Sequence, residues 1–535
     1  MSENTLIKSA GIKEEVSRRR TFAIISHPDA GKTTLTEKLL LYSGALHLAG
    51  AVRGGNSTSA TASDWMAMEQ QRGISISATA LEMDYKGFRI NLLDTPGHQD
   101  FSEDTYRTLM AVDSAVMVLD CAKGIEPQTE KLFKVCRMQN MPIITFINKM
   151  DHPGRDPLEL LDEIERMLGI TAAPMNWPIG EDIDFKGVYD FRNHQVQLYE
   201  RTAHNMFRAP VTVTGIDDPE LEKIIGGTAC SKLSGEVELL KGVGNVFNRE
   251  SYLAGKLTPV FFGSALNNFG VEPFLNAVLE LAPAPAARQV EGGVIDPNSQ
   301  DFYGFVFKVQ ANLDPRHRDR MAFMRVCGGK FTKDMPVFNP RLAKEVKLTR
   351  AFRLFARERE PIEEAFPGDV IGIISPGLFA IGDTVTTGKQ LRYAEIPRFP
   401  PEHFAVLHNK QISRYKQFNK GIDQLEEEGA IQVLYPEDVQ RREPVLAAVG
   451  VLQFDVVLSR LEQEYGVEAR TEILPYSCAR WVVGEKEAID RVFHLRRHDR
   501  QFRDSHGRMV LLFSSTWEFD YCQRENPGVK FLEMG

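Results

Sequence analysis

The sequence has little cysteine, and no two cysteines are spaced as in a zinc or redox motif. Six cysteines are scattered along 535 residues: Cys121, Cys136, Cys230, Cys327, Cys478 and Cys522. Structural zinc sites and disulfide frameworks both need clustered or regularly spaced cysteines, so the pattern argues against both. Scattered cysteines are typical of reduced thiols, which predicts a cytoplasmic protein.

The sequence also lacks long apolar runs, and its N-terminal region does not resemble a signal peptide. A membrane-spanning helix needs about 20 consecutive apolar residues, and the sequence contains no such run. The N-terminal region carries Lys8, Lys13, Glu14 and the arginines at 18–20 in place of a signal peptide's apolar core. We therefore expect no membrane partner and no secretion.

An excess of positive charge is absent as well. Lys and Arg total 64 against 73 Asp and Glu, for a net charge of −9, which argues against a protein that coats nucleic acid through its overall charge. Two local basic clusters remain, and each could be a solvated charged face or a contact for RNA phosphates. Their members are Arg341, Lys344, Lys347, Arg350, Arg353, Arg357 and Arg359, and His494, Arg496, Arg497, His498, Arg500, Arg503 and Arg508.

The sequence does contain a phosphate-binding loop near its N-terminus. An apolar run at 21–25 leads into Ser26, His27, Pro28, Asp29, Ala30, Gly31, Lys32 and Thr33, and an amphipathic segment follows. Strand, loop and helix in this order are what such a loop requires, although Ser26 replaces the first glycine of the usual signature. We expect Lys32 to act on the phosphates and the Thr33 hydroxyl to bind Mg²⁺. The alternative is a surface turn that happens to contain Gly-Lys-Thr.

A second motif follows the apolar run at 88–93 and consists of Asp94, Thr95, Pro96, Gly97 and His98. An acid at the end of a strand can hold Mg²⁺ through a water, and the N–H of Gly97 can reach the γ-phosphate. Upstream, a segment at 44–64 rich in Gly, Ser, Thr and Ala predicts a mobile loop. We expect Ser75 to supply a third Mg²⁺ ligand when this loop closes; the alternative for Ser75 is a solvent-facing strand serine.

Two further motifs predict the choice of base. Asn148, Lys149, Met150 and Asp151 follow an apolar run at 142–147, and Ser264, Ala265 and Leu266 follow another at 260–263. The Asp151 carboxylate can accept two hydrogen bonds from guanine but not from adenine, which predicts GTP rather than ATP. We expect Asn148 to brace the loops, the Lys149 stem to cover the base, and the loop at Ser264 to touch the guanine carbonyl.

These four motifs resemble those of the translational GTPases, and the segment from Asp64 to Ile76 is similar to elongation factor G. The resemblance implies that His98 orients the attacking water and that Pro28 and Ile74 flank it. The family usually has threonine at the position of Ser75 and an aliphatic residue at that of Pro28. Over the whole chain the resemblance is to the bacterial class II release factors. It implies a ribosome-dependent GTPase of translation termination that binds GTP or GDP with Mg²⁺.

The same resemblance implies the partners. They are the ribosome, through its RNA and protein, and the class I release factors that a class II factor removes; we expect a monomer. Elongation factor G has two more C-terminal domains than this chain, which favours termination over translocation or ribosome recycling. Two other hypotheses stay open: a nucleotide-sensing module with incidental hydrolysis, and an ATP-driven enzyme, which Asp151 disfavours.

The predicted fold is multidomain. Residues 1–285 should form an α/β GTP-binding domain, with an insert at about 160–250 because Asp151 and Ser264 lie much further apart than one helix and one strand require. A Pro-rich linker at 282–288 marks a boundary. Short strands then predict a β-barrel at 298–395, and helical periodicity mixed with strands predicts an α+β domain at 398–535.

Overall fold

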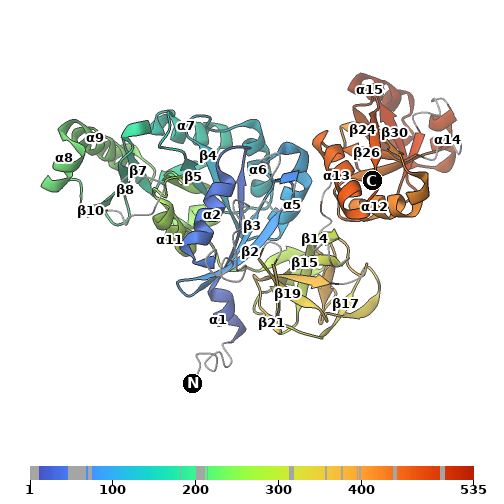
Figure 1. Ribbon diagram of the computed structural model, residues 1–535, viewed down its shortest axis with the longest axis horizontal. Helices are drawn as coiled ribbons and strands as arrows, with labels where there is room; N and C mark the ends of the chain where they lie inside the picture. Colours follow the sequence, from blue (N-terminus) through green and yellow to red (C-terminus); the bar gives the residue numbers. More distant parts are fainter. Residues whose placement is uncertain are drawn as a thin grey trace.

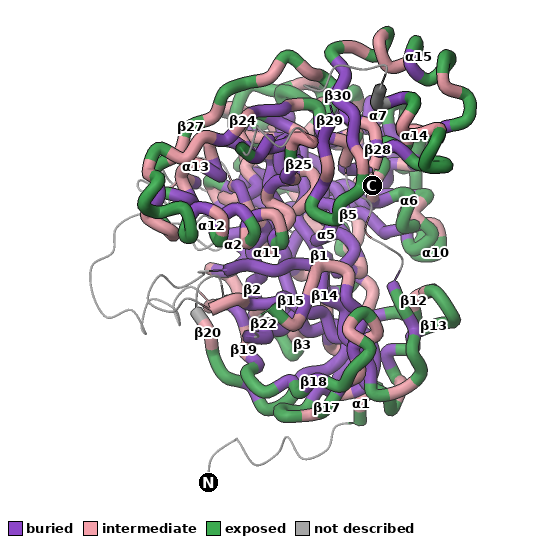
Figure 2. The backbone as a smooth tube through the Cα atoms, turned by 90° about the vertical axis from the view of Figure 1, so that its right-hand side faces the viewer, coloured by how far each residue is buried: buried purple, intermediate pink, exposed green. Residues whose placement is uncertain are grey.

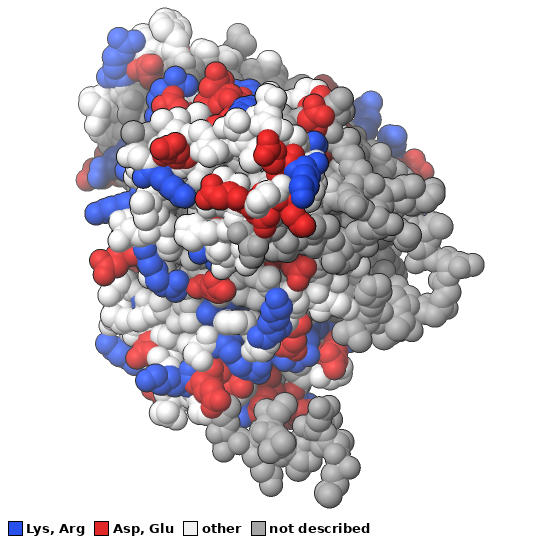
Figure 3. Space-filling model, turned by 90° about the vertical axis from the view of Figure 1, so that its left-hand side faces the viewer, with Lys and Arg blue, Asp and Glu red and all other residues white. Residues whose placement is uncertain are grey.

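The computed structural model describes residues 11–45, 68–69, 75–180, 182–199, 211–213, 215–311, 319–355, 358–374, 377–393, 396, 399–437, 443–494 and 501–534. The chain forms a large N-terminal body, a smaller β-rich body and a mixed C-terminal body (Figure 1). Among the helices so described, none is long and apolar enough to cross a membrane. Lys, Arg, Asp and Glu are interspersed on the face seen in Figure 3, as expected of a surface with charges of both signs.

The N-terminal body, the G domain, is built on a parallel sheet covered by helices. Its parallel strands neighbour one another in the order β3 (Phe88–Asp94), β1 (Arg19–Ser26), β4 (Ser114–Asp120), β5 (Ile143–Asn148), β11 (Leu257–Phe262) and β6 (Thr171–Pro174), and β2 (Thr79–Tyr85) adds antiparallel to β3. Helices on both faces explain why these strands are continuous apolar runs. The helices are α1 (Ile12–Ser17), α2 (Lys32–Tyr42), α5 (Ser102–Met110), α6 (Pro127–Met138), α7 (Pro157–Leu168) and α11 (Val271–Leu281), with the 3₁₀ turn η2 (Gln99–Phe101).

An added subdomain lies between β6 and β11. It contains an antiparallel sheet in the order β10 (Val211–Val213), β9 (Gln195–Leu198), β8 (Gly187–Asp190) and β7 (Asn176–Ile179), together with η3 (Asp182–Asp184), α8 (Pro219–Ile225), α9 (Gly227–Val243) and α10 (Arg249–Leu253). Trp177 anchors it, because its ring packs edge-on against Phe262 of the main sheet and its Nε1–H donates to Glu236 of α9. β6 pairs with β11 of the main sheet, and α7 packs beside β6. The added elements therefore begin at β7.

The β-rich body is a barrel with its own apolar core. Its strands are β14 (Tyr303–Ala311), β15 (Arg320–Gly328), β16 (Phe331–Thr332), β17 (Pro336–Asn339), β18 (Lys344–Lys347), β19 (Ala351–Phe355), β20 (Glu358–Pro361), β21 (Glu364–Ala365), β22 (Val370–Ile374) and β23 (Thr384–Thr386), preceded by the ribbon β12 (Arg288–Val290) and β13 (Gly293–Ile295). β19 pairs with β2 at Phe355 and Leu81, so the sheet continues into the G domain. A buried ion pair, Arg19 Nε to Asp369 Oδ1 at 2.7 Å, joins the two bodies.

The C-terminal body combines an antiparallel sheet with helices. The strands run in the order β27 (Ala469–Ile473), β24 (His403–Asn409), β26 (Val445–Ala448), β25 (Gln432–Pro436), β29 (Gln501–Asp504), β30 (Met509–Phe513), β28 (Cys478–Gly484) and β31 (Val529–Leu532). The remaining elements are η4 (Ile412–Arg414), α12 (Tyr415–Glu427), α13 (Leu452–Tyr465), α14 (Lys486–His494) and α15 (Thr516–Glu525). The apolar faces of α12 and α13 pack on the sheet, and its central strands are largely buried (Figure 2), whereas the edge strands β27 and β31 are largely exposed.

Candidate nucleotide-binding site

The phosphate loop joins β1 to α2 in the G domain. β1 ends at Ser26, and α2 begins at Lys32. Two loop residues have left-handed backbone, Asp29 with φ 66° and Gly31 with φ 90°. A Cβ at Gly31 would lie 2.2 Å from Nδ2 of Asn148, so glycine is required here both for its backbone and for the close approach of Asn148.

Lys32, Asp94 and Ser75 converge beside this loop. Lys32 Nζ lies 2.6 Å from Asp94 Oδ1 and 3.4 Å from Ser75 Oγ, and Lys32 and Asp94 are buried. Thr33 follows Lys32 in the first turn of α2. Hydroxyl and carboxylate oxygens are the donors that Mg²⁺ prefers in nucleotide sites, so Thr33, Ser75 and Asp94 fit the ion.

The motif that begins at Asp94 continues along the loop after β3. Thr95 Oγ1 donates to the carbonyl of Ile24 in β1, and the Pro96 carbonyl accepts from Thr105 of α5. An added Cβ on Gly97 would contact the backbone of His27 and Pro28 at 3.7 Å, so Gly97 lies against the phosphate loop. His98 follows with a side chain that is 28% exposed. Ile74 and the rest of 70–74, like 46–67, lie outside the described residues.

Asn148 joins the base-side loops to the phosphate loop. Its Nδ2 donates to the carbonyl of Ala30 at 2.8 Å, and its Oδ1 accepts from the N–H of Ala265 at 2.9 Å. Met150 is buried, and its N–H donates to the carbonyl of Gly263. Lys149 forms an ion pair with Asp120 at the end of β4, at 2.9 Å. The Asn148–Asp151 motif and the loop at Ser264, Ala265 and Leu266 therefore form one unit at the carboxyl edge of the sheet.

Asp151 presents one held and one free carboxylate oxygen. The residue is 8% exposed. Its Oδ2 accepts from Asn267 Nδ2 at 2.6 Å, whereas its Oδ1 is buried and has no hydrogen-bond partner among the described residues. A buried carboxylate oxygen without a donor is costly, so the site fits a ligand that brings donors of its own, as the N1–H and amino group of guanine do.

His27 is the most buried side chain of the phosphate loop to carry a titratable group. It is 1% exposed; Nε2 lies 3.1 Å from Glu126 Oε2, and Nδ1 lies 3.5 Å from Thr129 Oγ1. Burial lowers the pKa of His27, and the nearby Glu126 carboxylate opposes this only in part. A neutral imidazole therefore links the loop to the first turn of α6 and its N-cap, Glu126.

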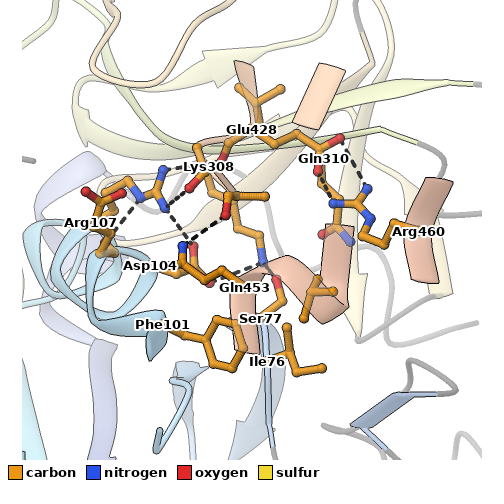
Figure 4. Close-up of a pocket in the computed structure, with 15 residues that line it drawn as sticks. Ile76, Ser77, Phe101, Asp104, Arg107, Lys308, Gln310, Glu428, Gln453 and Arg460 are labelled. Atoms are coloured by element: carbon orange, nitrogen blue, oxygen red, sulfur yellow. Dashed lines mark hydrogen bonds and ion pairs between the residues drawn. The ribbon is translucent and has the colours of Figure 1, made fainter. Parts of the chain in front are cut away.

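A second polar cluster joins the three bodies next to Ser75. Lys308 of the barrel donates to Ser77 Oγ at 2.5 Å and to the carbonyl of Ala78, while Asp104 of α5 accepts from the N–H of Ala78 at 2.6 Å. Glu428 of the C-terminal body accepts from the N–H of Ala311 and pairs with Arg460. Figure 4 shows these side chains pointing toward one another across the pocket. Burial lowers the pKa of Lys308, opposed by Asp104 and Glu69.

The two basic clusters of the sequence are partly neutralised. Arg341 pairs with Asp383, Arg353 with Glu82 and Arg359 with Asp319 in the first. Arg503 pairs with Glu437 and Arg508 with Asp504 in the second. Arg357 and residues 495–500, with Arg496, Arg497, His498 and Arg500, lie outside the described residues. For the paired arginines the structure favours a role in holding the fold.

The sequence motifs left out two contacts of the site, Asn267 on Asp151 and Lys308 on Ser77. Asn267 stands directly after Leu266, so the polar residues at 267–268 were an available signal for the first. Lys308 lies in an apolar strand pattern of the barrel, where a lone lysine was the signal. Their partners are 116 and 231 positions away in the chain, and spacing alone does not relate residues at such separations.

Comparison with known proteins gives matches along the whole chain. The family model "Elongation factor Tu GTP binding domain" matches residues 17–284, "Elongation factor G domain 2" matches 301–388, and "Class II release factor RF3, C-terminal domain" matches 393–523. These matches fall on the three bodies of the fold in the same order.

Curated relatives match nearly end to end. Peptide chain release factor 3 of Gloeobacter violaceus is 56% identical over 524 residues, which cover 97% of this chain and 98% of the relative. The protein of that name from a Cyanothece species is 55% identical and covers 97% and 96%. A crystal structure from Thermus thermophilus matches with a TM-score of 0.68 at 23% identity, over 87% of this chain and 71% of that chain; this likeness shows the fold alone.

Proposed function

Because the chain belongs to the peptide chain release factor 3 family of translational GTPases, which act in termination, we propose that it hydrolyses GTP to GDP and phosphate on the ribosome and so promotes departure of a class I release factor. The observation that carries the proposal is the convergence of Lys32, Asp94 and Ser75 beside the phosphate loop. Asp151, with its free buried oxygen, supports guanine as the base. On this proposal the protein acts as a cytoplasmic monomer.

The chemistry we propose is attack of water on the γ-phosphoryl group. Lys32 would bind the β- and γ-phosphate oxygens, and the N–H of Gly97 would donate to the γ-phosphate. Thr33 and Ser75, with Asp94 through a water, would hold Mg²⁺, which neutralises charge that develops on the phosphate oxygens. His98 would hold the attacking water in line with the scissile bond, and its partly exposed side chain leaves room for that water.

Hydrolysis without the ribosome should be slow. None of the proposed site positions is an arginine, and an arginine supplied in place or by a partner is worth about 10³–10⁵ in rate in other GTPases. We propose that the ribosome completes the site. Hydrolysis would then be coupled to termination, because GTP is hydrolysed fast only on a ribosome that carries a class I release factor.

The segment at 410–420 of the C-terminal body is our candidate contact for ribosomal RNA. It carries Lys410, Arg414, Lys416 and Lys420, all exposed, and no acidic residue. Ile412 is 88% exposed and Tyr415 is 57% exposed between these cations. Unlike Arg341, Arg353, Arg359, Arg503 and Arg508 of the two sequence clusters, Lys410, Lys416 and Lys420 have no ion-pair partner among the described residues. Free cations with an exposed aromatic ring suit phosphates and unstacked bases.

A release assay tests the coupling. A fluorescent class I release factor is bound to ribosomes paused at a stop codon, and its dissociation is followed after addition of this protein with GTP, with a non-hydrolysable GTP analogue, or with GDP. We expect fast dissociation with GTP and turnover of many complexes per protein molecule. Equal multiple turnover with the analogue would support a nucleotide-sensing module, and no effect of any nucleotide would contradict the proposal.

A further inference from the structure

The Asp100 carboxylate lies between His98 and the C-terminal body. Its Oδ1 is 3.2 Å from Nδ1 of His98, and its Oδ2 accepts a hydrogen bond of 2.9 Å from the N–H of Leu452, the first residue of α13. Asp100 is 6% exposed. One buried side chain thus touches both the histidine proposed to hold the attacking water and a domain 352 positions away in the chain.

The C-terminal body approaches this carboxylate through a glycine. A Cβ on Gly450 would lie 1.9 Å from Asp100 Cγ and within 2.3 Å of both carboxylate oxygens. The backbone of Gly450 is not left-handed, so it is the close approach to Asp100 that leaves no room for a side chain. Gln453 fixes the turn, because its Oε1 accepts from the N–H groups of Val449 and Gly450 at 2.8 and 3.2 Å.

Apolar contacts hold the same turn of the G domain. Phe101, which ends η2, clusters with Ile76 and with Val456 of α13, and the ring of Phe101 lies 6.2 Å from that of His98. Figure 4 shows Phe101 and Ile76 next to each other at this junction, with Gln453 beside them. The short turn after His98 is therefore packed against the C-terminal body through both a hydrogen bond and a buried apolar contact.

The contact at Nδ1 decides which ring nitrogen of a neutral His98 carries its proton. Nδ1 lies 3.3 Å from the N–H of Asp100 as well as 3.2 Å from its Oδ1. It can accept from the N–H only when unprotonated, and it can donate to the carboxylate only when protonated. The hydrogen bond that the structure shows comes from the N–H of Asp100, so Nδ1 is the acceptor, and a neutral ring then carries its proton on Nε2, which can donate to the attacking water.

We propose that Asp100 is a positioning residue for His98, and that docking of the C-terminal body holds Asp100 in that position. The inference rests on the proposed role of His98 and extends it to the partner domain. Contact of Gly450 and Leu452 with Asp100 makes His98 competent, and separation of the two bodies frees Asp100 and removes that competence. Movement of the C-terminal body on the ribosome would in this way change the position of His98 and the rate of GTP hydrolysis.

Gly450→Ala tests the proposal from the domain that contains no nucleotide-binding residue. The added methyl must displace the Asp100 carboxylate, so ribosome-stimulated kcat for GTP should fall roughly ten- to hundredfold, as expected for misplacement of a reacting group by about 1 Å. KM for GTP and the affinity for GDP should stay within about twofold of the parent. Asp100→Ala, which removes the acceptor for the N–H of Leu452, should act in the same way. Gly528→Ala is the matched control, since a Cβ there meets nothing within 4 Å.

The His98→Ala background separates the two levels of the argument. If His98→Ala keeps full ribosome-stimulated turnover, the proposed role of His98 is wrong and the inference fails with it. If His98→Ala is slow, Gly450→Ala should slow it no further. An undiminished kcat in Gly450→Ala, or an equal loss in both backgrounds, would overturn the positioning role alone.

A spectroscopic measurement keeps the proposal testable if Gly450→Ala does not fold. The ¹⁵N shifts of the imidazole ring, assigned with His98→Ala, report the tautomer of His98 in the GDP-bound protein. The parent should show the Nε2–H form, because Nδ1 accepts from the N–H of Asp100, and Asp100→Ala, which releases the turn from Leu452, should give a mixture of both forms. The same tautomer in both proteins would contradict the proposal.

Discussion

Asn267 holds the carboxylate of Asp151, with Nδ2 at 2.6 Å from Oδ2. The other oxygen is buried and has no hydrogen-bond partner among the described residues. The amide fixes the plane of the carboxylate, so if Asp151 selects guanine as we propose, that selection should depend on a pair of residues rather than on the acid alone.

Asn267→Ala should therefore weaken guanine selection more than nucleotide binding in general. Guanine donates to the carboxylate through its N1–H and its amino group, whereas hypoxanthine has only the N1–H. A tilted carboxylate should therefore weaken the binding of IDP less than that of GDP. Loss of one hydrogen bond to a charged group corresponds to about 1.5–3 kcal/mol, so GDP affinity should fall roughly tenfold or more. Competition binding of GDP and IDP checks this. An unchanged GDP-to-IDP ratio would contradict the pairing.

Gly31→Ala should abolish tight nucleotide binding. The substituted residue would have to keep φ at 90° and would put a Cβ 2.2 Å from Asn148 Nδ2, which braces the loop. Gly44→Ala is the control at the other end of α2, because its φ is 76° but nothing lies within 4 Å of its Cβ. Strain alone, about 1–2 kcal/mol, should lower the melting temperature in both, but only Gly31→Ala should lose GDP affinity, by about 100-fold or more. Isothermal titration with GDP measures the difference.

The stability of the protein should depend on His27 below about pH 6.5, the usual pKa of histidine. Burial lowers the pKa of His27 in the folded state, so the unfolded chain binds the proton first and folding free energy is lost as the pH falls. The groups that face the ring are Glu126, Lys123, Asp120 and Lys149. His27→Gln should flatten the decline in melting temperature between about pH 6.5 and pH 5.

His408→Gln provides a comparison of opposite sign. A hydrogen bond to Glu443, opposed by burial and aided by Glu472, raises the pKa of His408. Its stabilisation is therefore complete below the unfolded pKa and is lost as the pH rises through the folded value. Removal of His408 should cost stability at acid pH and little at alkaline pH. Parallel pH profiles for the two variants would contradict the assignment of their environments.

The lysines at 410, 416 and 420 should set the salt dependence of ribosome binding. Each phosphate contact contributes about 0.7–0.9 to the slope of log K against log salt. Replacing all three lysines by glutamine should lower the slope by roughly 2, whereas Lys131→Gln, an exposed lysine of α6, should leave it unchanged. An unaltered slope in the triple variant would exclude this surface as the RNA contact.

The sequence predicted the strands and loops of the G domain because local patterns determine them. Apolar runs at 21–25, 88–93 and 142–147 correspond to β1, β3 and β5, and each ends at a polar motif, as parallel strands buried on both faces require. The stripe of Phe418, Ile422 and Leu425 likewise lies on the buried face of α12.

Contacts between segments that are far apart in the chain could not be predicted from local sequence patterns. The approach of Gly450 to Asp100 depends on how two separate bodies dock, and nothing in either local sequence encodes it. Charge patterns were ambiguous for the same reason: Arg341 is neutralised by Asp383, which stands 42 positions further along the chain. The roles of the individual site residues stay predictions that the proposed variants test.

Single-turnover hydrolysis of GTP is the most direct test of the central claim, that ribosomes at termination complete this guanine-nucleotide site. The rate is measured for the protein alone, with ribosomes at a sense codon, and with ribosomes paused at a stop codon with a class I release factor bound. We predict slow hydrolysis alone and an acceleration of several orders of magnitude with the termination complex. Equal rates with and without ribosomes would contradict the account.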